Sequence, residues 1–380
     1  MAYSNPDPQN PVVLNVAVST PLSPVDLERR FCKVSCGDTN ITPSSIPREV
    51  TADDFTDSFA EPYTAKETYL WLVNFFANDA TGSAFILETG AVVEADPGTN
   101  IAALATHITN GVDVCGHYSV PDVFYGDADY ASLVTLYAGD DPVYKFSNHI
   151  THGTAPAEQT AFTGLTGKSN WFAVYPSAVS TENAVGAMVG IMASNVYDVS
   201  PSNKMTPLQY KQITGVTAEK LNTTMRTALT NNAVNYVGTI QSVTVLFNGR
   251  YADNFSWDYR FSERVTLQDI QNSLLALIIN GANVPAASVP YNQEGIDKLL
   301  AVANARASYR KSCNMVTDFS QTIDNTGTTL VDKNTFFAID YYTYKAANPA
   351  KYQAGEYDGL SGFIEIGKFF RKVTFNVTLM

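Results

Sequence analysis

The two ends of the chain show the same pattern, a strict alternation of apolar and polar residues. It runs through Val12–Ser19, between Pro11 and Pro21, and again through Lys372–Leu379. Alternation with a period of two predicts a half-buried β-strand. A strand at a chain end has an unpaired edge that favours pairing with another strand. The apolar positions of the two predicted strands are Val12, Leu14, Val16 and Val18, and Val373, Phe375, Val377 and Leu379.

Between these ends the pattern predicts strands and helices in alternation, which is typical of an α/β layer. Thr64 followed by Glu67 predicts a capping box, and the helix from Thr266 to Gly281 has the clearest start and stop signals. Residues 112–170 are rich in Gly, Asp, Pro and Tyr and are predicted to be mainly loop. The predicted strands cover parts of 31–40, 83–89, 170–178 and 235–247. The predicted helices cover 64–79, 99–111 (from Thr99 to Gly111), 180–197 (capped near Ser180 or Thr181), 218–231, 266–281 (from Thr266 to Gly281) and about 291–311.

The composition is that of a folded protein with an unusual surface. Of the 380 residues 45% are hydrophobic, 12% aromatic and only 16% charged, whereas about a quarter of the residues of soluble domains are charged. The length indicates two or three domains. A surface poor in charge and rich in Tyr, Asn and Thr suits burial against other subunits, although all-β proteins share this composition.

Charge and hydropathy exclude several partners. A net charge of −13 makes nucleic-acid binding an unexpected role. We expect no signal peptide, because the first residues lack a basic region and an apolar run. We also expect no membrane span, because the apolar stretches are short; "GAMVG" (Gly186–Gly190) only resembles a membrane packing motif. The four cysteines (Cys32, Cys36, Cys115 and Cys313) are expected to be reduced thiols.

The search for chemistry yields no convincing site. "GLTGKSNW" (Gly164–Trp171) ends like a phosphate-binding loop but lacks the first glycine and the following helix. His149 and His152 have no third metal ligand at a known spacing and are expected to be solvent-facing. "GDADY" (Gly126–Tyr130) lacks the later oxygen ligands of a calcium loop. The sequence therefore predicts no enzyme, no catalytic residues, no metal and no cofactor.

Two long segments resemble a known family. "GVTAEKLNTTMRTALTNNAVNYVGTI", from Gly215, and "RVTLQDIQNSLLALIINGANVPAASVPYNQEGIDKLL", from Arg264, resemble the C-terminal half of contractile phage tail sheath proteins. Weaker resemblance extends to Ser58–Asn78, to the segment from Asn170, and to the N-terminal "VVLNVAVSTPLSP". It covers about two-thirds of the chain and is absent from residues 80–165. The family's Gly-x-Phe-x-Asp strand is replaced here by "FSWDYRF".

The resemblance implies a multi-domain α/β (α+β) fold. An inner domain would hold a mixed sheet and packed helices, extended by terminal β-arms that add strands to neighbouring subunits. An outer α/β domain would complete the subunit. The implied boundaries are an N-terminal arm at 1–27, an outer domain at 28–235 that leaves open an inserted subdomain at about 85–200, an inner domain at 236–365 and a C-terminal arm at 366–380.

The resemblance also implies a function. The chain would be the subunit of a contractile phage tail sheath in the virion, assembled in the host cytoplasm. It would polymerise in helical rings around the tail tube and contract to drive the tube through the host envelope. Its partners would be itself, the tube, baseplate and tail terminator proteins, with Arg306, Arg310 and Lys311 as candidate tube-facing residues. The alternatives are another virion protein (capsid, tube or baseplate), the sheath of a phage-derived bacteriocin or injection system, and a soluble α/β enzyme.

Overall fold

The chain divides into two compact units in a computed structural model. Unit 2 comprises Val25–Asp198 and Pro207–Asp258, and unit 1 comprises Met1–Pro24, Val199–Thr206 and Tyr259–Met380. The structure describes residues 27–79, 82–92, 96–139, 142–153, 162–196, 199–284, 288–317, 321–322, 329–330, 336–362 and 364–369. Both predicted arm strands, 12–19 and 372–379, lie outside the described residues.

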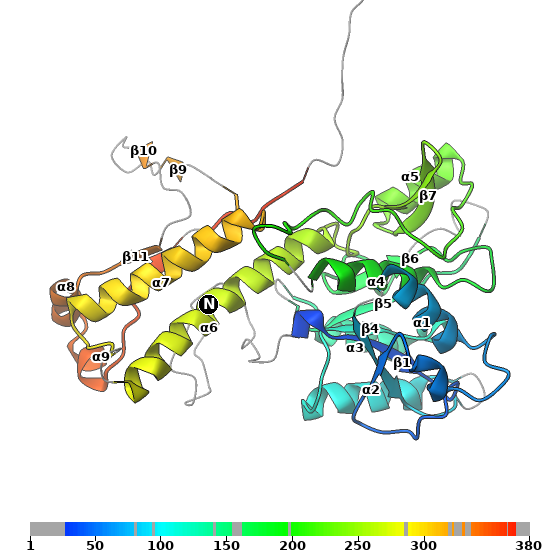
Figure 1. Cartoon of the computed structure of the whole chain (residues 1–380), viewed down its shortest axis with the longest axis horizontal. Coiled ribbons are helices and arrows are strands. Elements are labelled where there is room, and N and C mark those ends of the chain that lie inside the picture. The colour runs from blue at the N-terminus through cyan, green and yellow to red at the C-terminus, as the bar shows by residue number, and fades with distance from the viewer. Residues whose placement is uncertain are drawn as a thin grey trace, which may run out of the picture. The chain divides into compact units, whose positions relative to one another are not determined.

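Unit 2 is built on a six-stranded sheet in the order β2-β3-β1-β4-β5-β6. Strand β2 is antiparallel to β3, and the other neighbours are parallel. Cys32 of β1 pairs with Phe85 on one side and with Tyr118 on the other. The direction in which the chain adds strands therefore reverses between β1 and β4 (Figure 1). The strands are β1 (Phe31–Ser35), β2 (Arg48–Thr51), β3 (Ser83–Glu88), β4 (His117–Ser119), β5 (Lys145–His149) and β6 (Trp171–Val174).

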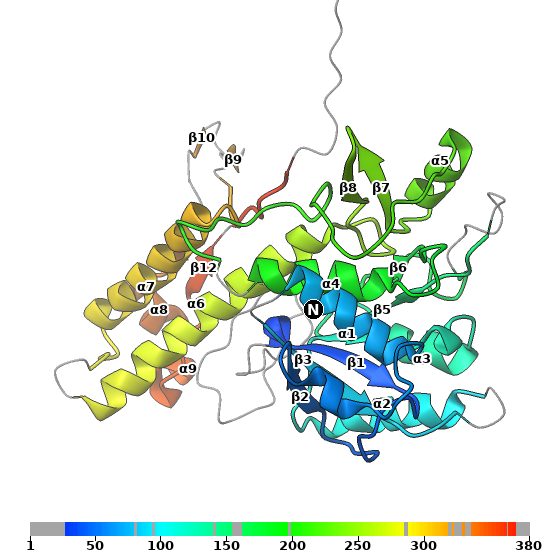
Figure 2. The same ribbon diagram turned by 45° about the vertical axis from the view of Figure 1, so that its right-hand side comes forward.

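Helices cover both faces of this sheet. Helices α1 and α4 lie side by side on one face, and α2 and α3 lie on the other (Figure 2). Gly186 and Gly190 of α4 allow the close approach to α1, because a Cβ at either position would come within 2.3 and 2.4 Å of the carbonyl oxygens of Trp71 and Phe75. The "GAMVG" segment thus packs two helices of unit 2. The helices are α1 (Glu67–Asn78), α2 (Gly98–Asn110), α3 (Ala128–Leu136) and α4 (Ala184–Val196).

The core between the sheet and α2–α3 is large and aromatic. Tyr118, Phe146 and Trp171 are fully buried on adjacent strands, and Leu104 of α2 and Tyr130 of α3 pack in the same cluster. Burying each such side chain contributes about 1.5–3 kcal/mol. Unit 2 therefore has a complete core of its own.

Beyond the sheet and helices α1 to α4, unit 2 contains a further helix followed by a β-hairpin. Helix α5 (Thr223–Asn231) leads into β7 (Tyr236–Ile240) and β8 (Val243–Phe247), which pair antiparallel. The two turn residues Gln241 and Ser242 have φ of 48° and 67°, as a type I′ hairpin turn requires. Three short 3-10 helices complete the unit: η1 (Leu27–Arg29), η2 (Phe55–Ser58) and η3 (Asp122–Phe124).

Unit 1 is built around two long helices that pack through a small cluster. Ile270 and Leu274 of α6 and Ala303 of α7 are its buried residues. A two-stranded antiparallel sheet, β11–β12, supplies Phe336 and Leu360 to the rim of this cluster. The elements are α6 (Trp257–Asn283), α7 (Gln293–Ser312), β9 (Gln321–Thr322), β10 (Thr329–Leu330), β11 (Phe336–Ala338), α8 (Tyr341–Ala347), α9 (Pro349–Ala354) and β12 (Leu360–Gly362).

The multi-domain α/β fold predicted from the sequence is confirmed, but residues 112–170 hold regular elements that the pattern did not predict. They contain β4, α3 and β5. Both strands are buried although they contain His, Lys, Ser and Asn. Because these residues are polar, the pattern of apolar residues did not predict the two strands. The predicted start of a helix at Thr266 is also wrong. Helix α6 begins at Trp257, Thr266 is buried within it, and the helix continues past Gly281 to Asn283.

Three further predicted helix caps are wrong. Helix α1 begins at Glu67 after Lys66, so Thr64 does not cap it, and α2 follows Pro97 rather than Thr99. Helix α4 begins after Asn183, whose side chain accepts a hydrogen bond from the backbone N–H of Gly186 at 2.8 Å. The stop at Gly111 is confirmed, with φ of 67°.

Over the described part of the chain, no helix is long and apolar enough to cross a membrane. All four cysteines are free thiols, and Cys32, Cys115 and Cys313 are fully buried.

Candidate functional site

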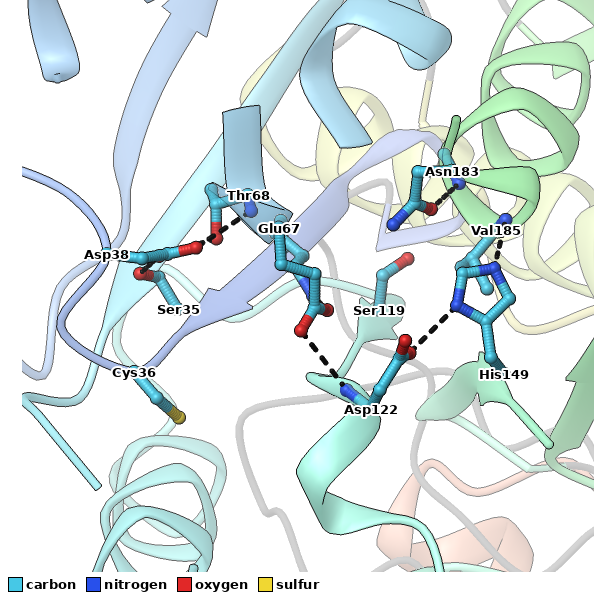
Figure 3. A network of polar contacts seen from close by, with 12 residues as sticks. Ser35, Cys36, Asp38, Glu67, Thr68, Ser119, Asp122, His149, Asn183 and Val185 are labelled. Carbon is cyan, nitrogen blue, oxygen red and sulfur yellow. Dashed lines mark hydrogen bonds and ion pairs between the residues drawn. The ribbon is translucent and has the colours of Figure 1, made fainter. Parts of the chain in front are cut away.

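Polar side chains gather in unit 2 where the parallel strands end, at the point where strand order reverses. Ser35, Ser119 and His149 occupy the carboxyl ends of β1, β4 and β5, and Asp38 and Asp122 follow two of these strands (Figure 3). In open α/β sheets the crevice outside this edge is the usual place for a ligand. The region is therefore the first candidate for a functional site.

The N-terminus of α1 is closed by a side chain of the protein itself. The Asp38 carboxylate accepts hydrogen bonds from the Thr68 backbone N–H and the Thr68 hydroxyl, both at 2.8 Å. The Ser35 hydroxyl donates to the same carboxylate (Figure 3). An anion at a helix N-terminus is stabilised by the helix dipole and by the unpaired N–H groups. Asp38 therefore occupies the helix N-terminus, where an anion would otherwise be stabilised.

A buried lysine lies beside this helix start. Lys33 of β1 is 1% exposed and forms an ion pair with Glu67, the first residue of α1. Burial disfavours the lysine's charge, but the Glu67 carboxylate outweighs it and raises the pKa of Lys33. Glu67 also accepts a hydrogen bond from the Asp122 backbone N–H at 3.3 Å (Figure 3). The Lys33–Glu67 contact thus ties β1 to α1.

His149 connects β5 to two other elements and is not the solvent-facing residue that the sequence predicted. Its Nδ1 lies 2.8 Å from Asp122 Oδ1, and its Nε2 lies 3.3 Å from the backbone nitrogen of Val185. Because the Val185 N–H must donate, Nε2 accepts, and Nδ1 carries the proton that is donated to Asp122. Both ring nitrogens are thus occupied. His152, in contrast, is exposed and its ring stacks on Tyr175.

These polar contacts join strands, helices and loops of unit 2 and so stabilise its fold. The Ser119 hydroxyl lies 3.0 Å from the Ser147 hydroxyl, so it is not aligned with the His149–Asp122 pair as a nucleophile would be. In the described ranges no group of three or more His, Cys, Asp or Glu side chains could hold a metal ion. In the Gly126–Tyr130 segment, Asp127 caps α3 and accepts hydrogen bonds from the N–H groups of Asp129 and Tyr130.

A second candidate is the basic end of α7 in unit 1, where the sequence placed three tube-facing residues. Arg310 Nε donates to Asp269 Oδ2 at 2.8 Å, and Arg306 Nε lies 3.9 Å from Asp269 Oδ1. The structure thus brings Arg306 and Arg310 together around one carboxylate of α6. Arg310 is largely buried, whereas Arg306 and Lys311 are exposed. Cations in the last turn also stabilise the helix itself.

Sequence reasoning missed Lys33, Asp38 and Asp122, and it gave Glu67 a role in a capping box instead of the ion pair with Lys33. Each lies within or just beyond a strand, or at a helix start, and a correct assignment of β4 and β5 would have placed Asp122 and His149 at one edge of the sheet. The eight predicted arm positions cannot be placed, because they lie outside the described residues.

Comparison with known proteins relates the whole chain to one class of assembly. No protein-family model and no curated protein sequence matches it. Among solved structures, the contracted sheath complex of the extracellular contractile injection system PVC matches with a TM-score of 0.57 at 12% identity, covering 100% of this chain and 98% of that chain. The contracted helical sheath of the anti-feeding prophage matches with a TM-score of 0.55 at 14% identity, covering 97% of this chain and 99% of that chain. A chain in the anti-feeding prophage baseplate matches with a TM-score of 0.55 at 12% identity and the same coverage. The chain has the fold of the contractile tail sheath proteins.

Proposed function

We propose that this chain is the subunit of a contractile sheath. It polymerises into stacked helical rings around a tube and contracts to drive that tube through the envelope of a target cell. The observation that carries the proposal is the coverage of the structural match, 97–100% of this chain and 98–99% of the sheath chains. A shared fold over both units is more specific than a shared α/β sheet alone.

The packing of unit 1 supports a subunit that needs neighbours. Among the described residues, the cluster between its two long helices has three buried members, and Leu275, Ile278, Leu299 and Val302 around them are half-buried. Two-stranded sheets are marginally stable in water by themselves, and β11–β12 is such a sheet. Neighbouring copies would bury the half-exposed apolar side chains and extend the sheet.

The terminal arms are the proposed source of those extra strands. Val12–Ser19 and Lys372–Leu379 alternate apolar and polar residues, the sequence pattern of a strand with one buried face. We assign β12 as the edge that accepts an arm of another copy. Each main-chain hydrogen bond would add about 0.5–1.5 kcal/mol and each buried large apolar side chain about 1.5–3 kcal/mol. Several arms per copy would hold the rings together while the copies rotate during contraction.

Charge is unequally divided between the two units. Of the 37 acidic and 24 basic residues, unit 2 holds 25 and 11, whereas unit 1 holds 12 and 13. Unit 2 thus carries a net −14 and unit 1 a net +1. A nearly neutral unit can be packed against its copies at low electrostatic cost. We therefore assign unit 1 to the closely packed inner layer of the sheath and unit 2 to its outer surface.

The proposed partners are other copies of the chain, the tube, the baseplate and the terminator. We assign Arg306 and Lys311 to contact with the tube surface, with Arg310 holding the end of α7 against Asp269. The particle would be a phage tail in a virion, or the sheath of a bacteriocin or injection system.

Electron microscopy of the purified chain tests the proposal. We expect long striated tubes from the full chain and none after removal of residues 366–380. A matched pair of variants distinguishes a specific loss of arm binding from a general loss of solubility. Phe375→Asp with Leu379→Asp should abolish assembly, whereas Asn376→Asp with Thr378→Asp, on the polar positions, should retain it. Persistent monomers of the full chain at high concentration would contradict the proposed function.

A second measurement distinguishes the particles. Sheath-containing particles purified from producing cells would carry a capsid if they are phage tails, and would end in a terminator without a capsid if they are injection systems.

A further inference from the structure

Five tyrosines gather at one end of unit 1, and we call them, with Lys345, the tyrosine surface. The ring centroids of Tyr291 and Tyr352 lie 5.0 Å apart, and those of Tyr341 and Tyr342 lie 5.2 Å apart. Tyr342 is 77% exposed, and the other four rings are half-buried. The tyrosine surface consists of Tyr291, Tyr341, Tyr342, Tyr352, Tyr357 and Lys345.

Hydrogen bonds hold most of these rings in place. The hydroxyls of Tyr341 and Tyr352 lie 2.8 Å apart. Tyr291 donates to the carbonyl of Glu356, and Tyr357 donates to the carbonyl of Ile339, both at 2.6 Å. Rings that are already ordered lose little conformational freedom when a partner binds, which is why tyrosine is enriched in binding surfaces. The tyrosine surface is therefore preorganised for a partner that stacks on aromatic rings.

One cation of this surface has no acid beside it. Lys345 Nζ lies 4.5 Å from the centre of the Tyr352 ring and 5.6 Å from that of Tyr341. Among the described residues no carboxylate pairs with it, whereas the neighbouring Lys351 is paired with Asp358. The surface thus fits a partner that combines flat apolar groups with a single negative charge.

We propose that the tyrosine surface binds residues 5–11 of a neighbouring copy, the sequence "NPDPQNP". Proline-rich segments favour an extended helix that docks on aromatic side chains. Pro6, Pro8 and Pro11 supply the apolar groups, and Asp7 is the only charged residue before Asp26. Asp7 pairs with Lys345.

The position of the surface agrees with the proposed arm. Tyr357 and Gly359 lead directly into β12, the strand to which we assign an arm such as Val12–Ser19. A segment just before that arm would then pass over the tyrosine surface. The choice of a neighbouring copy rests on the proposed function, whereas the match between the segment and the surface does not.

Photo-crosslinking in the full chain tests the inference. A copy labelled with nitrogen-15 and carrying p-benzoylphenylalanine in place of Tyr342 is mixed with excess unlabelled chain, assembled, irradiated and analysed by mass spectrometry. We expect crosslinks to unlabelled residues 5–11. The probe at Tyr210, an exposed position of unit 2, should give none to that segment.

A charge exchange provides the second readout. Lys345→Glu replaces the proposed attraction to Asp7 by a repulsion and should reduce the crosslink yield by about fivefold, the size of a surface ion-pair effect. Asp7→Lys in the unlabelled copy restores opposite charges and should restore the yield. The inference would be overturned by crosslinks to other segments or by crosslinks within the labelled copy alone. A crosslink yield that Lys345→Glu leaves unchanged would also overturn it. If striated tubes form without the expected crosslink, the inference fails alone; if no tubes form, the proposed function fails as well.

Discussion

Gly186 of α4 touches the backbone of Trp71 in α1 so closely that a Cβ would lie 2.3 Å from the Trp71 carbonyl oxygen. One turn further along both helices, Gly190 repeats this contact with Phe75 at 2.4 Å. The contacts are backbone to backbone, so neither neighbour can move aside as a flexible side chain would. Two glycines four residues apart thus set the distance between α1 and α4.

Gly186→Ala should therefore destabilise unit 2. We expect the free energy of unfolding to fall by about 1–3 kcal/mol, the usual cost of overpacking, although alanine favours a helix more than glycine does. Chemical denaturation followed by circular dichroism measures this change. Gly98→Ala is the matched control in α2, because its Cβ would meet only side-chain carboxylate oxygens at 3.2 and 3.5 Å. An equal effect of both variants would contradict the close packing of the helices.

The cap of α1 gives a direct comparison between sequence and structure. Asp38→Ala removes the acceptor of the Thr68 N–H and should cost about 0.5–2 kcal/mol of unfolding free energy. Thr64→Ala, at the cap predicted from the sequence, should change it by less than about 0.5 kcal/mol. Thermal or chemical denaturation of both variants decides between the two residues, and a larger loss from Thr64→Ala would favour the capping box.

A buried ion pair joins η1 to β5. Lys145 Nζ lies 2.6 and 2.8 Å from the two Glu28 oxygens, and both side chains are 4% exposed. Lys145→Met leaves a carboxylate buried without its cation and should cost about 3–5 kcal/mol. The double variant Lys145→Met with Glu28→Leu should recover most of this loss, because an apolar pair carries no desolvation penalty. Denaturation of the two single variants and the double variant gives the coupling energy, and additive losses would argue against the ion pair.

His117 should make unit 2 sensitive to acid. Burial, and then the nearby Lys145 cation, lower the pKa of His117 to about 3, whereas an unfolded histidine has a pKa of about 6.5. Between these two pKa values, His117 therefore binds a proton in the unfolded state but not in the folded state. Stability is lost as the pH falls from about 6.5 towards 3, by about 1.4 kcal/mol per pH unit.

The measurement compares the wild type with His117→Asn, which keeps a polar side chain facing Ser147 without a proton site in this range. Unfolding free energies between pH 7 and pH 4 should converge for the two proteins as the pH falls, because only the wild type carries this loss. Parallel curves over that interval would show that His117 is not the responsible group.

Much of the fold could be predicted from the pattern of apolar residues. The long helices and the strands rich in Val, Ile and Phe, such as Ser83–Glu88, are driven by local periodicity. Strands β4 and β5 could not be predicted, because residues such as His117 and Lys145 are buried there through ion pairs and hydrogen bonds with distant segments. Such partners are visible only after the chain has folded.

The candidate site was harder to predict for the same reason. Asp38 and Thr68 are 30 residues apart, and no local rule connects them. The predicted box of Thr64 and Glu67 satisfied every local requirement, but a more distant carboxylate provides the cap and Glu67 pairs with Lys33 instead. The pattern in "GAMVG" was noticed, yet its partner helix could not be identified from the sequence alone.

The uneven division of charge has a consequence for the surroundings of the molecule. Like-charged bodies repel one another over about 30 Å in 0.01 M salt but over only about 8 Å at physiological ionic strength. Because a net charge of −14 is concentrated in unit 2, copies of the chain can pack closely more easily at high salt than at low salt. Dissolved ions would then decide how tightly a lattice of this protein can close.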